Sequence, residues 1–137
     1  MANTKFFKLG SWAMIVTGFI HLIGHFVPPQ VDTKDKQKLL ELMSDLQFQL
    51  DPWYSRSVSN LFDCFSLFLT VTLLTLGLNN LIVAKHKMEL STVKSMSLVC
   101  FVGMASAMIL SLVYAFSIPI ILFAICSALM MMSYMKA

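Results

Sequence analysis

The sequence has 137 residues, of which 58% are hydrophobic and only 12% are charged, and its net charge is +3. A soluble globular domain has about 45–50% apolar and about 25% charged residues. This composition excludes a soluble enzyme domain, a disordered chain and a nucleic-acid-binding module, and the length allows one small domain. These properties indicate a small integral membrane protein.

Four apolar runs are long enough to cross a bilayer as helices, which takes about 20 apolar residues each. We predict membrane-spanning helices over residues 6–27, 58–83, 94–116 and 117–134. The apolar residues of each run are continuous and do not alternate with polar ones, which excludes a transmembrane β-barrel. The predicted fold class is therefore all-α, an integral membrane four-helix bundle in a single domain.

The segment between the first two predicted spans is the longest hydrophilic part of the chain. Over residues 33–50, leucine and methionine recur every three or four positions, with lysine and acidic residues on the other faces. This spacing predicts an amphipathic helix in the first loop, on the outer membrane surface or folded over the end of the bundle. Trp53 and Tyr54 follow directly, and we expect them to be anchors at the membrane interface.

The basic residues indicate how the chain crosses the membrane. Six of the ten lie at the two ends of the chain and in the middle loop, whereas the other four share the first loop with five acidic residues. Because lysine and arginine are concentrated on the cytoplasmic side of membrane proteins, both termini are predicted to be cytoplasmic.

Small residues suggest where the helices approach one another. Gly10, Thr17 and Gly24 recur every seven residues in the first predicted span, and Gly103 with Ala107 forms a small-xxx-small pair in the third. Such residues let helix backbones come close in lipid, so we expect them either to pack within a compact four-helix bundle or to form a surface for a partner.

Three ionisable side chains lie well inside the predicted spans, where they are costly and mark candidate functional sites. His21 and His25 share one face of the first helix, and Asp63 lies near the start of the second. A rise of about 1.5 Å per residue places all three at a similar depth on the outer side. On the second helix, Arg56, Asn60 and Asp63 share a face. The predicted polar cluster at the outer mouth of the bundle comprises His21, His25, Arg56, Asn60 and Asp63.

The chemistry of this cluster has several alternatives. Two histidines and a carboxylate can bind a metal ion, so His21, His25 and Asp63 are candidate ligands of a metal or, through the histidines, of haem. Histidine and aspartate can also relay protons or hold a substrate. In a third alternative, Asp63 accepts a hydrogen bond from a histidine, or pairs with Arg56, and forms a structural clasp between the first two helices.

The paired histidines and their surroundings resemble those of a known bacterial family. The resemblance rests on GFIHLIGHF at residues 18–26, the charged loop helix, SRS at residues 55–57 and NLFD at residues 60–63. Members of that family are small four-helix membrane proteins without an established activity. The resemblance therefore implies the four-helix fold and a bacterial inner membrane.

A second resemblance implies chemistry. Arg56, Asn60 and Asp63, followed by FSLFL at residues 65–69, resemble the second-helix pattern of the membrane-associated eicosanoid and glutathione metabolism family. Members of that family have four helices, form trimers and bind glutathione between subunits. The resemblance implies that Arg56 and Asn60 contact glutathione and that Asp63 replaces the usual glutamate. The arginine pair that ends the first helix in that family is absent here.

Three hypotheses about function follow. The leading one is a non-catalytic small membrane protein, either an accessory subunit or a homo-oligomer, because the chain has little extramembrane mass and no recognisable set of nucleophile and base. The second is a metal, haem or proton-handling site at His21, His25 and Asp63. The third is a glutathione-dependent transferase that uses Arg56, Asn60 and Asp63. The expected partners are the lipid bilayer and another membrane protein or a second copy, and no nucleic acid.

Overall fold

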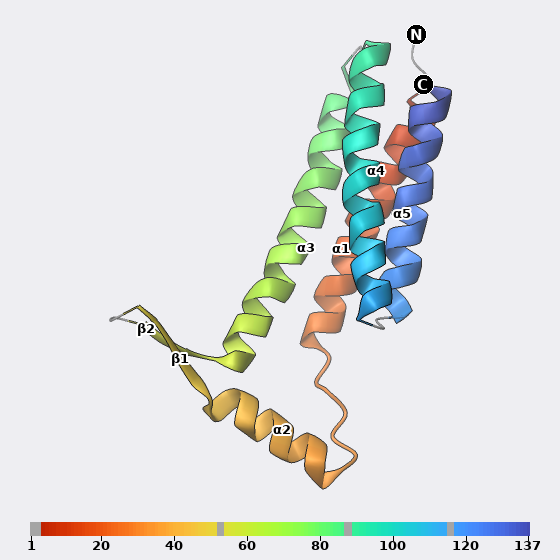
Figure 1. Cartoon of the computed structure of the whole chain (residues 1–137). Coiled ribbons are helices and arrows are strands. Elements are labelled where there is room, and N and C mark those ends of the chain that lie inside the picture. The colour runs from red at the N-terminus through yellow and green to blue at the C-terminus, as the bar shows by residue number, and fades with distance from the viewer. Residues whose placement is uncertain (1–3, 52–53, 87–88, 115–116) are drawn as a thin grey trace. The chain divides into compact units, whose positions relative to one another are not determined.

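The structure is a computed structural model of the chain, and it describes residues 4–51, 54–86, 89–114 and 117–137. Within these residues the chain forms five helices and a two-stranded antiparallel sheet (Figure 1). In chain order the elements are α1 (Lys5–Phe26), α2 (Lys34–Asp45), β1 (Gln47–Asp51), β2 (Tyr54–Ser57), α3 (Val58–Val83), α4 (Leu90–Val113) and α5 (Ser117–Lys136). The helices α1, α3, α4 and α5 are long and apolar enough to span a membrane, which confirms the predicted all-α, four-helix membrane fold.

The observed helices lie close to the predicted spans. Helix α3 covers the predicted residues 58–83, and α1 and α5 differ from the predictions by one or two residues at their ends. Helix α4 begins at Leu90, four residues before the predicted start, because Val93 is buried and its N–H donates to the carbonyl oxygen of Glu89 at 3.2 Å. It ends at Val113, and residues 115–116 of the predicted span lie outside the described residues.

The predicted loop helix over residues 33–50 is too long. Helix α2 ends at Asp45, and residues 47–50 belong to β1, which pairs with β2 so that Phe48 lies opposite Arg56. The prediction was wrong at this end because Leu46 and Leu50 fit a helical spacing, whereas QFQL at residues 47–50 also alternates between polar and apolar side chains. For so short a run the two periods cannot be separated, and strand pairing decides between them.

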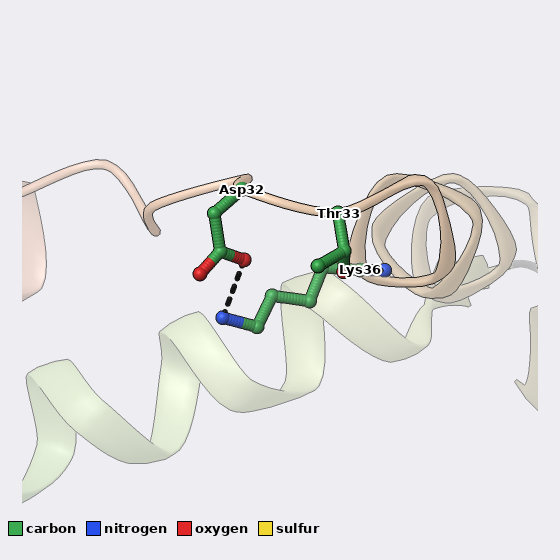
Figure 2. A network of polar contacts seen from close by, with 3 residues as sticks. All are labelled: Asp32, Thr33 and Lys36. Atoms are coloured by element: carbon green, nitrogen blue, oxygen red, sulfur yellow. Dashed lines mark hydrogen bonds and ion pairs between the residues drawn. The ribbon is translucent and has the colours of Figure 1, made fainter.

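The start of α2 carries a helix cap at Thr33 and an ion pair between Asp32 and Lys36 (Figure 2). Thr33 is the N-cap, and its Oγ1 accepts a hydrogen bond from the backbone N–H of Lys36 at 3.3 Å. The Nζ of Lys36 also lies 2.6 Å from the Oδ1 of Asp32, in an exposed ion pair that adds little stability. No residue of α2 is buried, and its apolar side chains Leu39 and Leu42 are exposed. The expected position of this helix, on the outer membrane surface or over the end of the bundle, stays a prediction.

The chain divides into two compact units. The first combines the described parts of Met1–Phe19 and Thr72–Ala137, and the second is Ile20–Val71. In the first unit, α4 and α5 run antiparallel and side by side (Figure 1). The buried apolar side chains of this unit include Phe7, Met14, Leu73, Val93, Cys126 and Met130.

Several buried polar groups in the first unit are paired between helices. The pairs are Ser97 with Ser133, whose hydroxyl oxygens lie 2.7 Å apart, Asn80 Nδ2 with Cys100 Sγ at 3.4 Å, and Thr17 Oγ1 with Cys126 Sγ at 3.5 Å. Among the described residues, no buried side-chain nitrogen or oxygen lacks a partner. This completeness is what hydrocarbon demands, because an unsatisfied polar group there costs several kcal/mol.

Gly77 allows a close approach between two helices of the first unit. A Cβ atom on Gly77 would lie 2.6 Å from Cγ1 of Ile15 and 2.8 Å from the backbone oxygen of Ser11, so α3 approaches α1 more closely than alanine would allow. By contrast, a Cβ on Gly24 or Gly103 would meet nothing within 4 Å. Among the described residues, no neighbouring helix therefore packs on these last two glycines.

These contacts predict opposite effects for two matched substitutions. Gly77→Ala forces α3 away from the backbone of Ser11 and should lower the free energy of unfolding by about 1–3 kcal/mol. Gly103→Ala meets no atom and removes a helix-destabilising glycine, so stability should stay equal or rise by about 0.5–1 kcal/mol. Reversible unfolding in bicelles measures both, and equal effects of the two variants would contradict the close approach at Gly77.

Candidate functional site

Both histidines of α1 contact the same hydroxyl group on α3. The Oγ of Ser66 lies 3.2 Å from the Nε2 of His21 and 3.2 Å from the Nδ1 of His25. All three side chains are half-buried and belong to the unit Ile20–Val71. We call these three residues the His–Ser–His cluster.

Helix geometry and ring packing position the cluster. His21 and His25 are four residues apart on α1, so their rings project from the same face. The ring of His25 also packs edge to face on Phe26, with the centroids 5.1 Å apart and the planes at 74°. On α3, the carbonyl oxygen of Ser66 accepts a hydrogen bond from the Oγ1 of Thr70 at 3.2 Å, and the Ser66 hydroxyl is directed at the histidines.

The Ser66 hydroxyl has the capacity to satisfy both rings at once. A hydroxyl carries one proton and two acceptor lone pairs, and a neutral imidazole carries one donor and one acceptor nitrogen. One ring can therefore donate to the oxygen while the other accepts the hydroxyl proton. The cluster needs no charged member, which suits a membrane-spanning segment.

Asp63 does not belong to this cluster. Its side chain is exposed on α3, and no hydrogen bond or ion pair between the described residues joins it to either histidine. It lines a shallow hollow on the surface of α3. The other lining residues are Asn60, Cys64, Leu67, Phe68 and Val71. The structure thus places Ser66, and not the predicted carboxylate, beside the paired histidines.

The predicted metal-ligand set is not assembled in the structure. Within the described ranges of the chain, no three side chains of the histidine, cysteine, aspartate or glutamate type lie close enough together to hold a metal ion. The two histidines have a hydroxyl between them, and the third predicted ligand, Asp63, faces the hollow on α3.

Arg56 lies outside α3, contrary to the expectation that it continues the helical face of Asn60 and Asp63. It belongs to β2, and α3 begins only at Val58. The helix begins there because the Oγ of Ser57 accepts a hydrogen bond from the backbone N–H of Asn60 at 3.2 Å, in the manner of an N-cap. The three residues that resemble a glutathione site are therefore divided between a strand and a helix.

The side chains of the two predicted interface anchors lie outside the part of the chain that the structure describes. Trp53 lies outside the described residues, and so does the side chain of Tyr54, whose backbone begins β2. Their role at the membrane interface stays a prediction.

Ser66 is the member of the site that the sequence does not single out. It lies one turn beyond Asp63 in a helix that carries several other hydroxyl side chains, so its residue type is no signal. The only hint is that Ser66 continues the stripe of polar and small residues that also contains Asn60, Thr70 and Gly77. That stripe indicates which face of the helix is polar, but it does not indicate which of its residues contacts the histidines.

Comparison with known proteins gives no match: no family model, no curated protein and no solved structure matches this chain. The functional inference therefore depends on the geometry of the His–Ser–His cluster.

The assignment of Ser66 as the partner of both histidines predicts how ring ¹⁵N resonances respond to two substitutions. Ser66→Ala removes the shared hydroxyl and should move the ring resonances of His21 and His25 together. Asp63→Asn removes a carboxylate that bonds neither ring and should move them far less. Solution NMR of histidine-labelled protein in nanodiscs makes this comparison, and a larger displacement in Asp63→Asn would contradict the assignment.

Proposed function

We propose that this chain is a non-catalytic small polytopic membrane protein in which the His–Ser–His cluster is a neutral clasp between its first two membrane-spanning helices. The observation that supports this proposal is the double contact of Ser66 Oγ, at 3.2 Å from each histidine. Each interhelical hydrogen bond of this kind contributes about 0.6–2 kcal/mol in a membrane. Two of them converge on one atom, so loss of Ser66 removes both.

The clasp would serve to hold α1 against α3 in the unit Ile20–Val71. The part of α1 in this unit also exposes large apolar side chains such as Ile23 and Phe26, at 66% and 72% exposure. Exposed apolar surface on a membrane helix is free to face lipid or another protein. We therefore also propose that the chain acts as an accessory subunit or as a homo-oligomer, with its polar groups joined internally and its apolar faces outward.

A proton-handling role at the two histidines is the second candidate, and it is favoured by the hydroxyl that links their rings. A metal or haem role at His21, His25 and Asp63 has less support, because the carboxylate faces a different part of α3. The glutathione alternative has less support as well, because Arg56 is in β2 while Asn60 and Asp63 are in α3.

A double-mutant cycle tests the clasp. Ser66→Ala should lower the free energy of unfolding by about 1–3 kcal/mol, and His25→Ala by a similar amount. The double variant should lose clearly less than the sum, because both single changes break the same contact. Reversible unfolding in bicelles provides the four values.

Ser111→Ala is the matched control for this cycle. The Ser111 hydroxyl donates only to the carbonyl oxygen of Ala107, one turn earlier in the same helix, at 2.8 Å. Its loss should change stability by less than about 0.5 kcal/mol. If Ser66→Ala is as mild as this control, or if its effect and that of His25→Ala are additive, the clasp is not the role of the cluster.

We propose further that the chain lies in a bacterial inner membrane with both termini in the cytoplasm. An even number of candidate spanning helices supports both termini on one side, and the distribution of lysine and arginine favours the cytoplasmic side. Helix α2 and the strands would then lie on the outer side.

This orientation predicts which introduced cysteines react from outside the cell. In spheroplasts, a membrane-impermeant maleimide should label Ser44→Cys, at the end of α2, and should leave Ala137→Cys unlabelled until the membrane is opened. The parent chain with its three native cysteines gives the background signal. The reverse pattern of labelling would place both termini outside.

A further inference from the structure

The Ser66 hydroxyl couples the protonation patterns of the two histidines, because it contacts different nitrogens of the two rings. The contacts are with Nε2 of His21 and with Nδ1 of His25. The hydroxyl has a single proton to donate. When it donates to one ring, that ring must present a bare nitrogen, and the other ring must present an N–H.

Two complete arrangements follow from this geometry. In the first, His21 Nε2–H donates to Oγ and the hydroxyl donates to Nδ1 of His25, so both rings carry their proton on Nε2. In the second, His25 Nδ1–H donates to Oγ and the hydroxyl donates to Nε2 of His21, so both rings carry their proton on Nδ1. In either arrangement the two neutral rings are the same tautomer.

We propose that the His–Ser–His cluster is a proton relay, in which Ser66 passes one proton between His21 and His25 as the cluster changes from one arrangement to the other. The inference rests on the proposed function insofar as the same contacts form the clasp. It adds an activity to them, with a proton as the ligand and water as its source and acceptor.

The transfer balances at each atom. Starting from the first arrangement, water delivers a proton to the free Nδ1 of His21, which makes that ring cationic. The Nε2–H bond of His21 then breaks and its proton bonds to Oγ, while the original O–H bond breaks and that proton bonds to Nδ1 of His25. The positive charge is now on His25, which releases its Nε2 proton to water. One proton has passed from Nδ1 of His21 to Nε2 of His25, and the second arrangement results.

Few other ionisable side chains lie on the helical segments that carry the relay. In the helical segments that meet here, residues 20–26 and 58–71, the other ionisable side chains are those of Asp63 and Cys64. Both are exposed and line the hollow on α3. Neither forms an ion pair with a ring among the residues that the structure describes, so the proton has the two imidazoles and the hydroxyl as its sites.

Ring ¹⁵N spectroscopy of the full chain in phosphatidylcholine nanodiscs tests the relay. The change His86→Gln removes the signals of the third histidine, which lies in the turn after α3. At a pH where both rings are neutral, we expect His21 and His25 to report the same tautomer. When one proton has been added to the pair, we expect exchange cross-peaks between the two rings.

Two substitutions at Ser66 supply the controls. Ser66→Ala should release the rings from a common tautomer and slow exchange between them by about 100-fold or more, because a positioned proton carrier is lost. Ser66→Thr keeps a hydroxyl and should retain both signatures. Ser111→Ala should match the parent chain.

The outcomes separate the relay from the clasp. Opposite tautomers in the parent chain mean either that both rings donate to Oγ or that both present a bare nitrogen to it, and either result overturns the relay. Exchange that is unchanged in Ser66→Ala overturns it as well. If either result is found while Ser66→Ala still lowers the unfolding free energy, the clasp stands and only the relay fails. If Ser66→Ala alters neither spectra nor stability, both proposals fail.

Discussion

Hydrocarbon supplies no hydrogen-bonding partner, and this constraint decides how the polar side chains of the four long helices are arranged. No buried side-chain nitrogen or oxygen in the described part of the chain lacks a hydrogen-bond partner. The partners are mostly small and neutral: hydroxyl with hydroxyl at Ser97 and Ser133, hydroxyl with thiol at Thr17 and Cys126. The His–Ser–His cluster follows the same rule with larger groups. A neutral pair leaves no buried charge behind, so it is the least costly way to join two helices through polar atoms.

Side-chain hydrogen bonds of this length also require helices to approach closely, and the small residues of the chain provide that approach. Gly77 lets α3 rest on the backbone of α1 at Ser11, and Gly10 leaves room for Met130 of α5, where a Cβ would lie 2.9 Å from the Cε. In lipid, packing replaces the hydrophobic drive that joins helices in water. Close contact and polar pairing therefore support each other in the first unit, since each brings the partners of the other within range.

The sequence predicts the spans well and the contacts poorly, for a physical reason. A spanning helix is encoded by about twenty consecutive apolar residues. The bounds predicted for α3 are therefore the observed ones. A contact between helices depends on their rotation, and residues in a nearly uniform apolar helix carry little information about it. Asp63 and Ser66 are three residues apart, about 60° around the helix, and residue type favoured the carboxylate. The strand β1 was missed because its four-residue alternation also fits a helix, and the pairing with β2 is a contact between segments.

The order of polar residues along α3 explains why the hydroxyl and not the carboxylate meets the histidines. The 26 residues of α3 extend about 39 Å, whereas the hydrocarbon is about 30 Å thick, so about three residues at each end of a centred helix reach the headgroups. Asn60 then lies at the edge of the hydrocarbon and Asp63 about 3 Å inside it, and both side chains are exposed. Ser66, one turn further in, is half-buried and bonds two imidazoles. Thr70, one more turn along, is buried and donates to the carbonyl oxygen of Ser66. Along α3, the exposure of these polar side chains thus falls with distance from the start of the helix. A carboxylate at the position of Ser66 would need a compensating charge, whereas a hydroxyl satisfies both rings without one.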